Sequence, residues 1–142
     1  MPRWSEYTLR RRVQFYELDL AGIVHFSCFF RYMEEAEHAL WRAAGLSIAQ
    51  PGADFGFPRV ATSFDFHTPL RFEEEFDARI RIVAIAEKTI RYTCVLTRGD
   101  VKVATGTLTI ICVSKRPNEP MRARPIPAEI AAKFEVSADA DA

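Results

Sequence analysis

The chain has 142 residues, with 19 basic and 19 acidic side chains, so its formal net charge is zero. This length suits one domain that buries its own core without disulfides or metals. The balanced charge excludes an overall field that would attract nucleic acid or an anionic membrane. No apolar run is long enough to cross a bilayer and the N-terminus has no signal-peptide core, so we expect a cytoplasmic protein with neither of these partners.

The cysteines indicate a reducing compartment. Cys28, Cys94 and Cys112 are odd in number, widely spaced and set among apolar residues. A disulfide framework or a zinc site needs paired or closely spaced cysteines. We therefore expect free, buried thiols and no metal.

The N-terminal part of the chain predicts a strand followed by one long helix. Residues Tyr7 to Phe15 mix apolar side chains with three arginines, as in a strand with one solvent-exposed face. From Cys28 to Ala44, apolar residues recur at spacings of three and four, which is the period of an amphipathic helix. Ser27 is the predicted N-cap, and Gly45 can adopt the left-handed conformation that ends the helix.

After a loop from Gln50 to Pro58 the period changes from helical to two. Alternating apolar residues predict strands at 59–66, 78–84, 90–96 and 101–113. We expect these four strands to be consecutive and joined as hairpins. From Thr107 onward both faces carry apolar or β-branched side chains, so the second face needs a cover, and subunit pairing is its simplest source.

The C-terminal part predicts a short helix from Glu129 to Phe134, after Pro125 and Pro127. Residues 137–142 form a predicted frayed tail. We expect a single domain over residues 1–136. Its fold class is α+β, with one long central helix wrapped by an antiparallel sheet of about five strands.

The most informative segment lies directly before the predicted helix, where the chain reads Asp-Leu-Ala-Gly-Ile-Val-His-Phe from Asp19 to Phe26. Backbone N–H groups in the first turn of a helix have no partner within the helix, and the helix dipole adds a positive potential there. A developing oxyanion would be stabilised at such a helix end. The carboxylate beside it suggests acyl transfer.

Four segments carry a resemblance to a known family: 15–26 around that motif, 30–36 in the helix, Thr-Pro-Leu-Arg at 68–71 and Arg-Pro-Ile-Pro at 124–127. With them the chain resembles the 4-hydroxybenzoyl-CoA thioesterase family of the hotdog fold, from about Tyr7 to Phe134. The resemblance implies an acyl-CoA thioesterase that forms homodimers or tetramers of dimers, with active sites at the subunit interface. It implies no metal and no cofactor, because coenzyme A enters as part of the substrate; an acyl carrier protein is the alternative carrier.

By resemblance, Asp19 is the catalytic aspartate and Phe26 supplies the backbone N–H that polarises the thioester carbonyl. An ionised Asp19 then acts either as nucleophile or as general base for a water molecule. Gly22 makes the tight turn that aims the helix at the site, and Gly22 and Ser27 are candidate substrate-binding residues. Relatives often have tyrosine at position 25 or 26, whereas here His25 adds a group that exchanges protons near neutral pH.

Plainer interpretations stand beside these assignments. Asp19 is also a typical turn former, and we favour a packing or capping role for His25 over a role as base. His67 is expected at the surface or at an interface. Three glutamates of the predicted helix are expected to form a solvated or interface face: Glu34, Glu35 and Glu37. The minority interpretation is that one of them acts as a base.

Cations are needed for the phosphates of coenzyme A, and the first candidates are Lys115 and Arg116, just past the long strand. A second set of candidates consists of Arg91, Arg98, Arg122 and Arg124. Two other functional classes remain open. One is a non-hydrolytic hotdog protein that binds acyl groups, and the other is a dehydratase or hydratase acting on acyl-CoA or acyl carrier protein.

Overall fold

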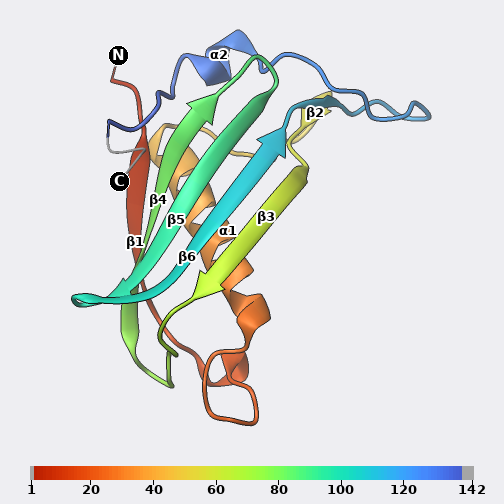
Figure 1. Cartoon of the computed structure of the whole chain (residues 1–142). Helices are drawn as coiled ribbons and strands as arrows, with labels where there is room; N and C mark the ends of the chain where they lie inside the picture. The colour runs from red at the N-terminus through yellow and green to blue at the C-terminus, as the bar shows by residue number, and fades with distance from the viewer. Residues whose placement is uncertain (1, 139–142) are drawn as a thin grey trace.

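The computed structural model describes residues 2–138 and has the predicted α+β hotdog architecture. One long helix lies across one face of a five-stranded antiparallel sheet, so that the sheet wraps around it (Figure 1). The helices are the 3-10 helix η1 (Phe15–Glu17), α1 (Phe26–Ala43) and α2 (Ala128–Ala131). The strands are β1 (Glu6–Arg12), β2 (Phe55–Gly56), β3 (Arg59–Phe66), β4 (Glu75–Ile85), β5 (Thr89–Arg98), β6 (Val101–Ile111) and β7 (Val113–Ser114).

The strand order in the large sheet is β1-β4-β5-β6-β3. As predicted, β4, β5 and β6 are joined as consecutive hairpins. The prediction is wrong for β3, which pairs with β6. The reason is that β4 already has β1 on one edge and β5 on the other. Within residues 2–138 no strand pairs with the other edge of β3, so β3 is an edge strand of the sheet.

The buried stripe of α1 follows the predicted period. Phe29, Met33, Ala36 and Leu40 are each at most 4% exposed, and they face the sheet. Directly after the helix, Gly45 has a φ of +82°, the predicted left-handed conformation.

The start of α1 differs from the prediction by two residues. The helix begins at Phe26, and its N-cap is His25 instead of Ser27. The cause is that Nδ1 of His25 accepts a hydrogen bond from the backbone N–H of Ser27 at 3.2 Å. An imidazole nitrogen therefore takes the place of the side-chain oxygen that commonly caps a helix.

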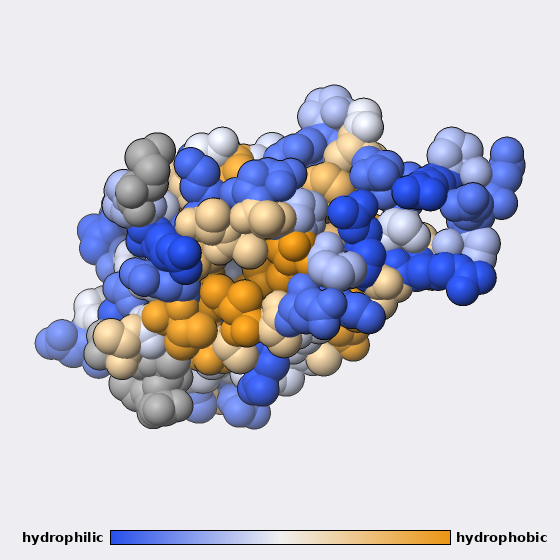
Figure 2. Space-filling view, turned by 90° about the horizontal axis from the view of Figure 1, so that it is seen from above, coloured by the Kyte–Doolittle hydropathy of each residue, from blue (hydrophilic) through white to orange (hydrophobic). Residues whose placement is uncertain are grey.

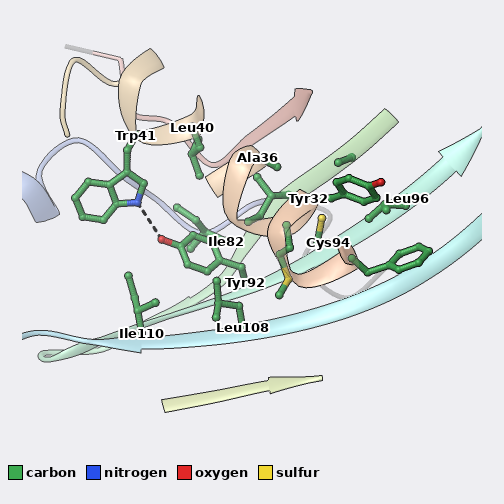
Figure 3. Close-up of a cluster of buried hydrophobic side chains, with 14 of the residues drawn as sticks. Tyr32, Ala36, Leu40, Trp41, Ile82, Tyr92, Cys94, Leu96, Leu108 and Ile110 are labelled. Carbon is green, nitrogen blue, oxygen red and sulfur yellow. Dashed lines mark hydrogen bonds between the residues drawn. The ribbon is translucent and has the colours of Figure 1, made fainter. Parts of the chain in front are cut away.

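Two aromatic residues tie the second half of α1 to the sheet. The indole N–H of Trp41 donates to the hydroxyl oxygen of Tyr92 on β5 at 3.0 Å, inside the hydrophobic core (Figure 3). Cys94, also on β5, is buried next to this cluster, and burial raises the pKa of its thiol to about 12. Cys94 and Cys112 are buried and Cys28 is half-buried, and all three are free, as expected.

Several element boundaries also move. β1 ends at Arg12 and not at Phe15, because the chain turns into η1. The predicted loop 50–58 contains β2, which pairs with β7. The predicted strand 101–113 divides at Cys112, because β6 ends at Ile111 and the next two residues form β7, which pairs with β2.

The short helix α2 lies at the end of the molecule away from the start of α1 (Figure 1). Seen from above, hydrophobic side chains gather in the middle of this end of the molecule, and the segment after β7 projects as a hydrophilic arm (Figure 2).

The predicted helix 129–134 is present as the shorter helix α2, Ala128–Ala131. Ser137, where the predicted tail begins, is buried and donates its N–H to Ile82 at 2.8 Å, while residues 139–142 lie outside the described range.

No helix in residues 2–138 has the length and hydropathy needed to cross a bilayer.

A buried ion pair links α1 to the edge strand β3. Glu37 is 0% exposed, and its carboxylate is bound by both terminal nitrogens of Arg59, one of them at 3.4 Å. Burial raises the pKa of Glu37 above its ordinary value, and Arg59 opposes this rise. The guanidinium of Arg59, helped by a hydrogen bond to Tyr92, therefore favours the ionised form of this buried carboxylate.

We predict that Arg59→Met lowers the free energy of unfolding by about 3 kcal/mol near neutral pH, since it leaves a buried carboxylate without its cation. The substitution raises the pKa of Glu37 further, so the native state binds a proton more tightly than the unfolded state, and the loss shrinks as the pH falls toward the ordinary glutamate value. Urea unfolding at about pH 5 and about pH 8 measures both effects. The control Arg10→Met removes an exposed pair with Asp77 and is expected to change little. A loss that is the same at both pH values would contradict this account.

Candidate active site

Residues 18–25 form a small hairpin that leads from η1 into α1. Within it, the N–H of Asp19 donates to the carbonyl of Ile23 at 2.8 Å, and the N–H of Gly22 donates to the carbonyl of Asp19 at 3.0 Å. Gly22 has a φ of +78°, which glycine adopts at least cost. The tight turn predicted at Gly22 is therefore present, and it holds Asp19 next to the helix start.

The carboxylate of Asp19 has two roles in this geometry. Its Oδ1 accepts hydrogen bonds from the backbone N–H groups of Ala21 at 2.8 Å and Ile23 at 3.4 Å. Asp19 is therefore a turn former, as the plainer interpretation holds. In the described part of the chain its Oδ2 has no hydrogen-bond partner, so one carboxylate oxygen remains available to a substrate.

The first backbone N–H groups of α1 are only partly satisfied. His25 engages two of them, since its Nδ1 accepts from Ser27 and its carbonyl accepts from Cys28 at 2.9 Å. The N–H of Phe26 has no acceptor among residues 2–138. An anionic oxygen placed there would gain a hydrogen bond and a favourable interaction with the helix dipole.

Asp19 and Phe26 line the same cavity of about 330 Å³. The other residues of its wall are Ile23, Val24, Phe29, Phe66, His67, Thr68 and Pro69. The wall is mainly apolar, and the rings of Phe29 and Phe66 meet edge to face at 5.0 Å. Such a cavity can receive an apolar group with a few polar atoms at one end.

The segment 66–69 is the part of this wall that sequence reasoning missed. His67 was expected at the surface or at an interface; it is exposed, yet it also belongs to the cavity wall. Its Nε2 lies 3.2 Å from Oγ1 of Thr105. The segment reaches the hairpin because the N–H of Val24 donates to the carbonyl of Leu70 at 2.9 Å. No spacing in the sequence signals this contact.

Asp19 also lines a second hollow, of about 610 Å³. Gly22 and His25 line it together with Phe15, Leu18 and Leu20. The candidate binding residue Ser27 is exposed beside it, with its Oγ 2.8 Å from Nδ1 of His25. Asp19 is thus part of the wall of both hollows.

The structure does not bring Lys115 and Arg116 to Asp19 within one chain. They follow β7, at the far end of α1, whose 18 residues correspond to a length of about 27 Å. Lys115 lines a separate hollow of about 510 Å³. Arg116 lies 3.7 Å from the carboxylate of Asp54.

None of the three helix glutamates lines a hollow with Asp19 in the described chain. Glu35 accepts a hydrogen bond from Arg11 at 2.7 Å, and Glu37 is buried against Arg59. Glu34 is exposed, 3.9 Å from Arg59. Glu34 therefore fits the predicted solvated face, whereas the prediction is wrong for Glu37, which is buried because it pairs with Arg59 inside the molecule.

The fold is that of the hotdog thioester hydrolases. Residues 13–134 match the model of the thioesterase-like superfamily, and the chain belongs to this family. A putative esterase from Aquifex aeolicus is 32% identical over 100 residues, which are 69% of this chain and 77% of that protein. A 1,4-dihydroxy-2-naphthoyl-CoA hydrolase from Synechococcus elongatus is 22% identical over 95% of this chain and 99% of its own length.

Solved structures agree with the fold. A hypothetical protein from Aquifex aeolicus superposes with a TM-score of 0.83 at 26% identity, over 91% of this chain and 99% of that one. The chain is a thioester hydrolase by class, as the sequence resemblance implies.

Proposed function

We propose that this protein hydrolyses acyl-CoA thioesters whose acyl group is an aryl ring or a short chain. The observation that carries the proposal is that Asp19 and the start of α1 at Phe26 line one apolar cavity of about 330 Å³. Its aromatic walls suit a flat ring. The relative from Synechococcus elongatus is a hydrolase of 1,4-dihydroxy-2-naphthoyl-CoA, which also supports an aryl substrate.

In this proposal the thioester oxygen accepts the N–H of Phe26 while Asp19 acts at the carbonyl carbon. As a nucleophile, Asp19 forms a mixed anhydride that water then cleaves; as a general base, it takes a proton from the attacking water. The N–H and the helix dipole stabilise the tetrahedral oxyanion. Coenzyme A leaves as a thiolate, a good leaving group that needs no strong general acid.

His25 serves as a helix cap in this scheme, because its Nδ1 is occupied by the N–H of Ser27. A dehydratase or hydratase would need an acid-base pair such as a histidine bonded to a carboxylate. Among residues 2–138, His25 bonds to Ser27 and His67 to Thr105, and neither is paired with a carboxylate, which weighs against that class. A non-hydrolytic acyl-binding protein is separated from a hydrolase by turnover alone.

A panel of thioesters tests the proposal. Thiol release is measured with benzoyl-, hydroxybenzoyl- and naphthoyl-CoA, with acetyl- and palmitoyl-CoA, and with one aryl group on acyl carrier protein. We expect kcat/KM for the best aryl substrate to exceed that for palmitoyl-CoA by at least about tenfold, because the aromatic side chains of the cavity wall favour a flat ring over a flexible chain. If no thioester released thiol, the proposal of hydrolysis would be wrong; equal rates for aryl and palmitoyl groups would contradict the assignment of the cavity.

We further propose that the functional unit is a homodimer formed by two β3 edges, alone or within a tetramer of dimers. The outer edge of β3 lacks a strand partner among residues 2–138, and the strand exposes 57% of Val60 and 50% of Phe66. An unpaired apolar edge is a template for pairing with a second copy. Because Phe66 also lines the cavity, such pairing would place the active site at the subunit interface.

The dimer would also give a role to the cations that lie far from Asp19. In an antiparallel pair of β3 strands, the end of one chain that carries β2 and β7 lies next to the hairpin 18–25 of the other. Lys115 and Arg116 of one subunit would then approach the site of its partner. We propose that they bind the phosphates of coenzyme A there.

Val60→Lys is predicted to convert the dimer into the 16.2 kDa monomer and to lower kcat/KM at least about tenfold, since a charge at the paired edge opposes association. Light scattering after gel filtration measures the mass. Val101→Lys is the matched control, because Val101 is also exposed, at 41%, but lies at the hairpin between β5 and β6. A wild-type monomer, or a Val60→Lys dimer of full activity, would contradict the proposed interface.

A further inference from the structure

A buried carboxylate lies two residues before Asp19. Glu17 is 5% exposed, although glutamate is rarely buried without a partner. Its side chain takes three hydrogen bonds: Oε1 accepts from Arg11 at 2.9 Å and from the backbone N–H of Gln14 at 2.8 Å, and Oε2 lies 2.8 Å from the second terminal nitrogen of Arg11. The proposed mechanism makes no use of this group.

The backbone of Glu17 continues the same set of contacts. Its N–H donates to the carbonyl of Gln14 at 3.0 Å, so side chain and backbone together close the turn η1. Its carbonyl accepts the N–H of His25 at 2.8 Å, at the other end of the hairpin 18–25. Both limbs of the hairpin that carries Asp19 therefore meet at Glu17.

Arg11 anchors this junction to β1 and to α1. Its Nε donates to Glu35 at 2.7 Å, and its guanidinium lies 4.7 Å from the centre of the Tyr32 ring. Burial lowers the pKa of Arg11, but the hydrogen bonds to Glu17 and Glu35 outweigh this and raise it. Arg11 therefore stays positively charged, and it pairs with two carboxylates, those of Glu17 and Glu35.

We propose that Glu17 is a positioning residue for thioester hydrolysis, which holds Asp19 and the Phe26 N–H at a fixed separation through its bonds to Arg11, Gln14 and His25. The inference rests on the proposed function. It predicts that loosening this junction costs turnover more than binding, because the oxyanion contact matters most in the transition state.

Glu17→Gln is the direct test, and Glu35→Gln is its matched control. Each variant removes one carboxylate from Arg11 and leaves it the other, so neither strands a buried cation. Of these two glutamates, only Glu17 is bonded to the hairpin, through its backbone carbonyl. For Glu17→Gln we expect kcat to fall about tenfold to a hundredfold with KM within about twofold of the wild type, whereas Glu35→Gln keeps both.

Amide hydrogen exchange supplies a readout that does not depend on turnover. In Glu17→Gln the N–H groups of His25 and Asp19 are expected to exchange at least about tenfold faster than in Glu35→Gln, because the hairpin opens locally. If the wild-type protein hydrolysed no thioester, the proposed function would be wrong. The exchange rates would still decide whether Glu17 stabilises the hairpin.

Equal kcat and equal exchange in the two variants would overturn the inference, as would a rise in KM with unchanged kcat. If Glu17→Gln does not fold, Arg11→Lys decides the question, since lysine cannot bind both oxygens of Glu17. A fall in kcat with faster exchange at His25 supports the inference, and wild-type values of both overturn it.

Discussion

Asp19→Asn is expected to lower kcat for the best aryl-CoA by about a hundredfold to ten thousandfold, the range that removal of a general base or nucleophile covers. The asparagine amide oxygen can still accept the N–H groups of Ala21 and Ile23, which Oδ1 of Asp19 accepts now. The turn therefore remains, and the variant loses the ionised carboxylate only. Steady-state thiol release, with circular dichroism to confirm folding, measures the effect.

This substitution separates the two roles of Asp19. If Asp19 serves only as a turn former, Asp19→Asn keeps its activity and Asp19→Ala loses it through a disordered hairpin. The control Asp100→Asn changes an exposed aspartate between β5 and β6, and it is expected to have no effect. Undiminished turnover in Asp19→Asn would remove the carboxylate from the mechanism.

Phe26→Pro is the second substitution with a large expected effect, because it deletes the backbone N–H assigned to the thioester oxygen. Proline is tolerated at the first position of a helix, where Phe26 lies. The preceding residue, His25, already has the extended backbone that proline demands, with φ −63° and ψ 137°. Loss of one oxyanion donor is expected to lower kcat about a hundredfold to a thousandfold.

Phe26→Ala provides the comparison, since it removes the exposed ring and keeps the N–H. We expect this variant to change KM more than kcat, because the ring contributes to the cavity wall. The ratio of kcat between Phe26→Ala and Phe26→Pro isolates the backbone donor. A ratio near one, with both proteins folded, would show that this N–H does not act on the substrate.

The fold was largely predictable, because its elements carry strong local periods. The helix and the strands were found from spacings of three to four and of two. The position of β3 was not, since β4 has both edges occupied, and only long-range pairing decides this. The sequence favoured a packing or capping role for His25, which the structure confirms, but it placed the N-cap at Ser27. The usual preference for hydroxyl and carboxylate caps does not anticipate an imidazole nitrogen that accepts the N–H of Ser27.

The candidate site divides in the same way. Asp19 and Phe26 are close in sequence, and a short hairpin keeps them close in space, so one motif was sufficient to propose both. The cavity wall at 66–69 and the contact between Arg11 and Glu17 depend on how β1 and the connection after β3 pack around the hairpin. No local sequence pattern predicts either contact.

The central claim is that Asp19 and the N–H of Phe26 act on one carbonyl group. A crystal structure of Asp19→Asn with bound hydroxybenzoyl-CoA tests it most directly. We expect the thioester oxygen within about 3 Å of the Phe26 nitrogen, the residue 19 side chain beside the carbonyl carbon, and the substrate ring inside the cavity that Phe29 and Phe66 line. A thioester bound elsewhere, with residue 19 turned away from it in both subunits, would contradict the account.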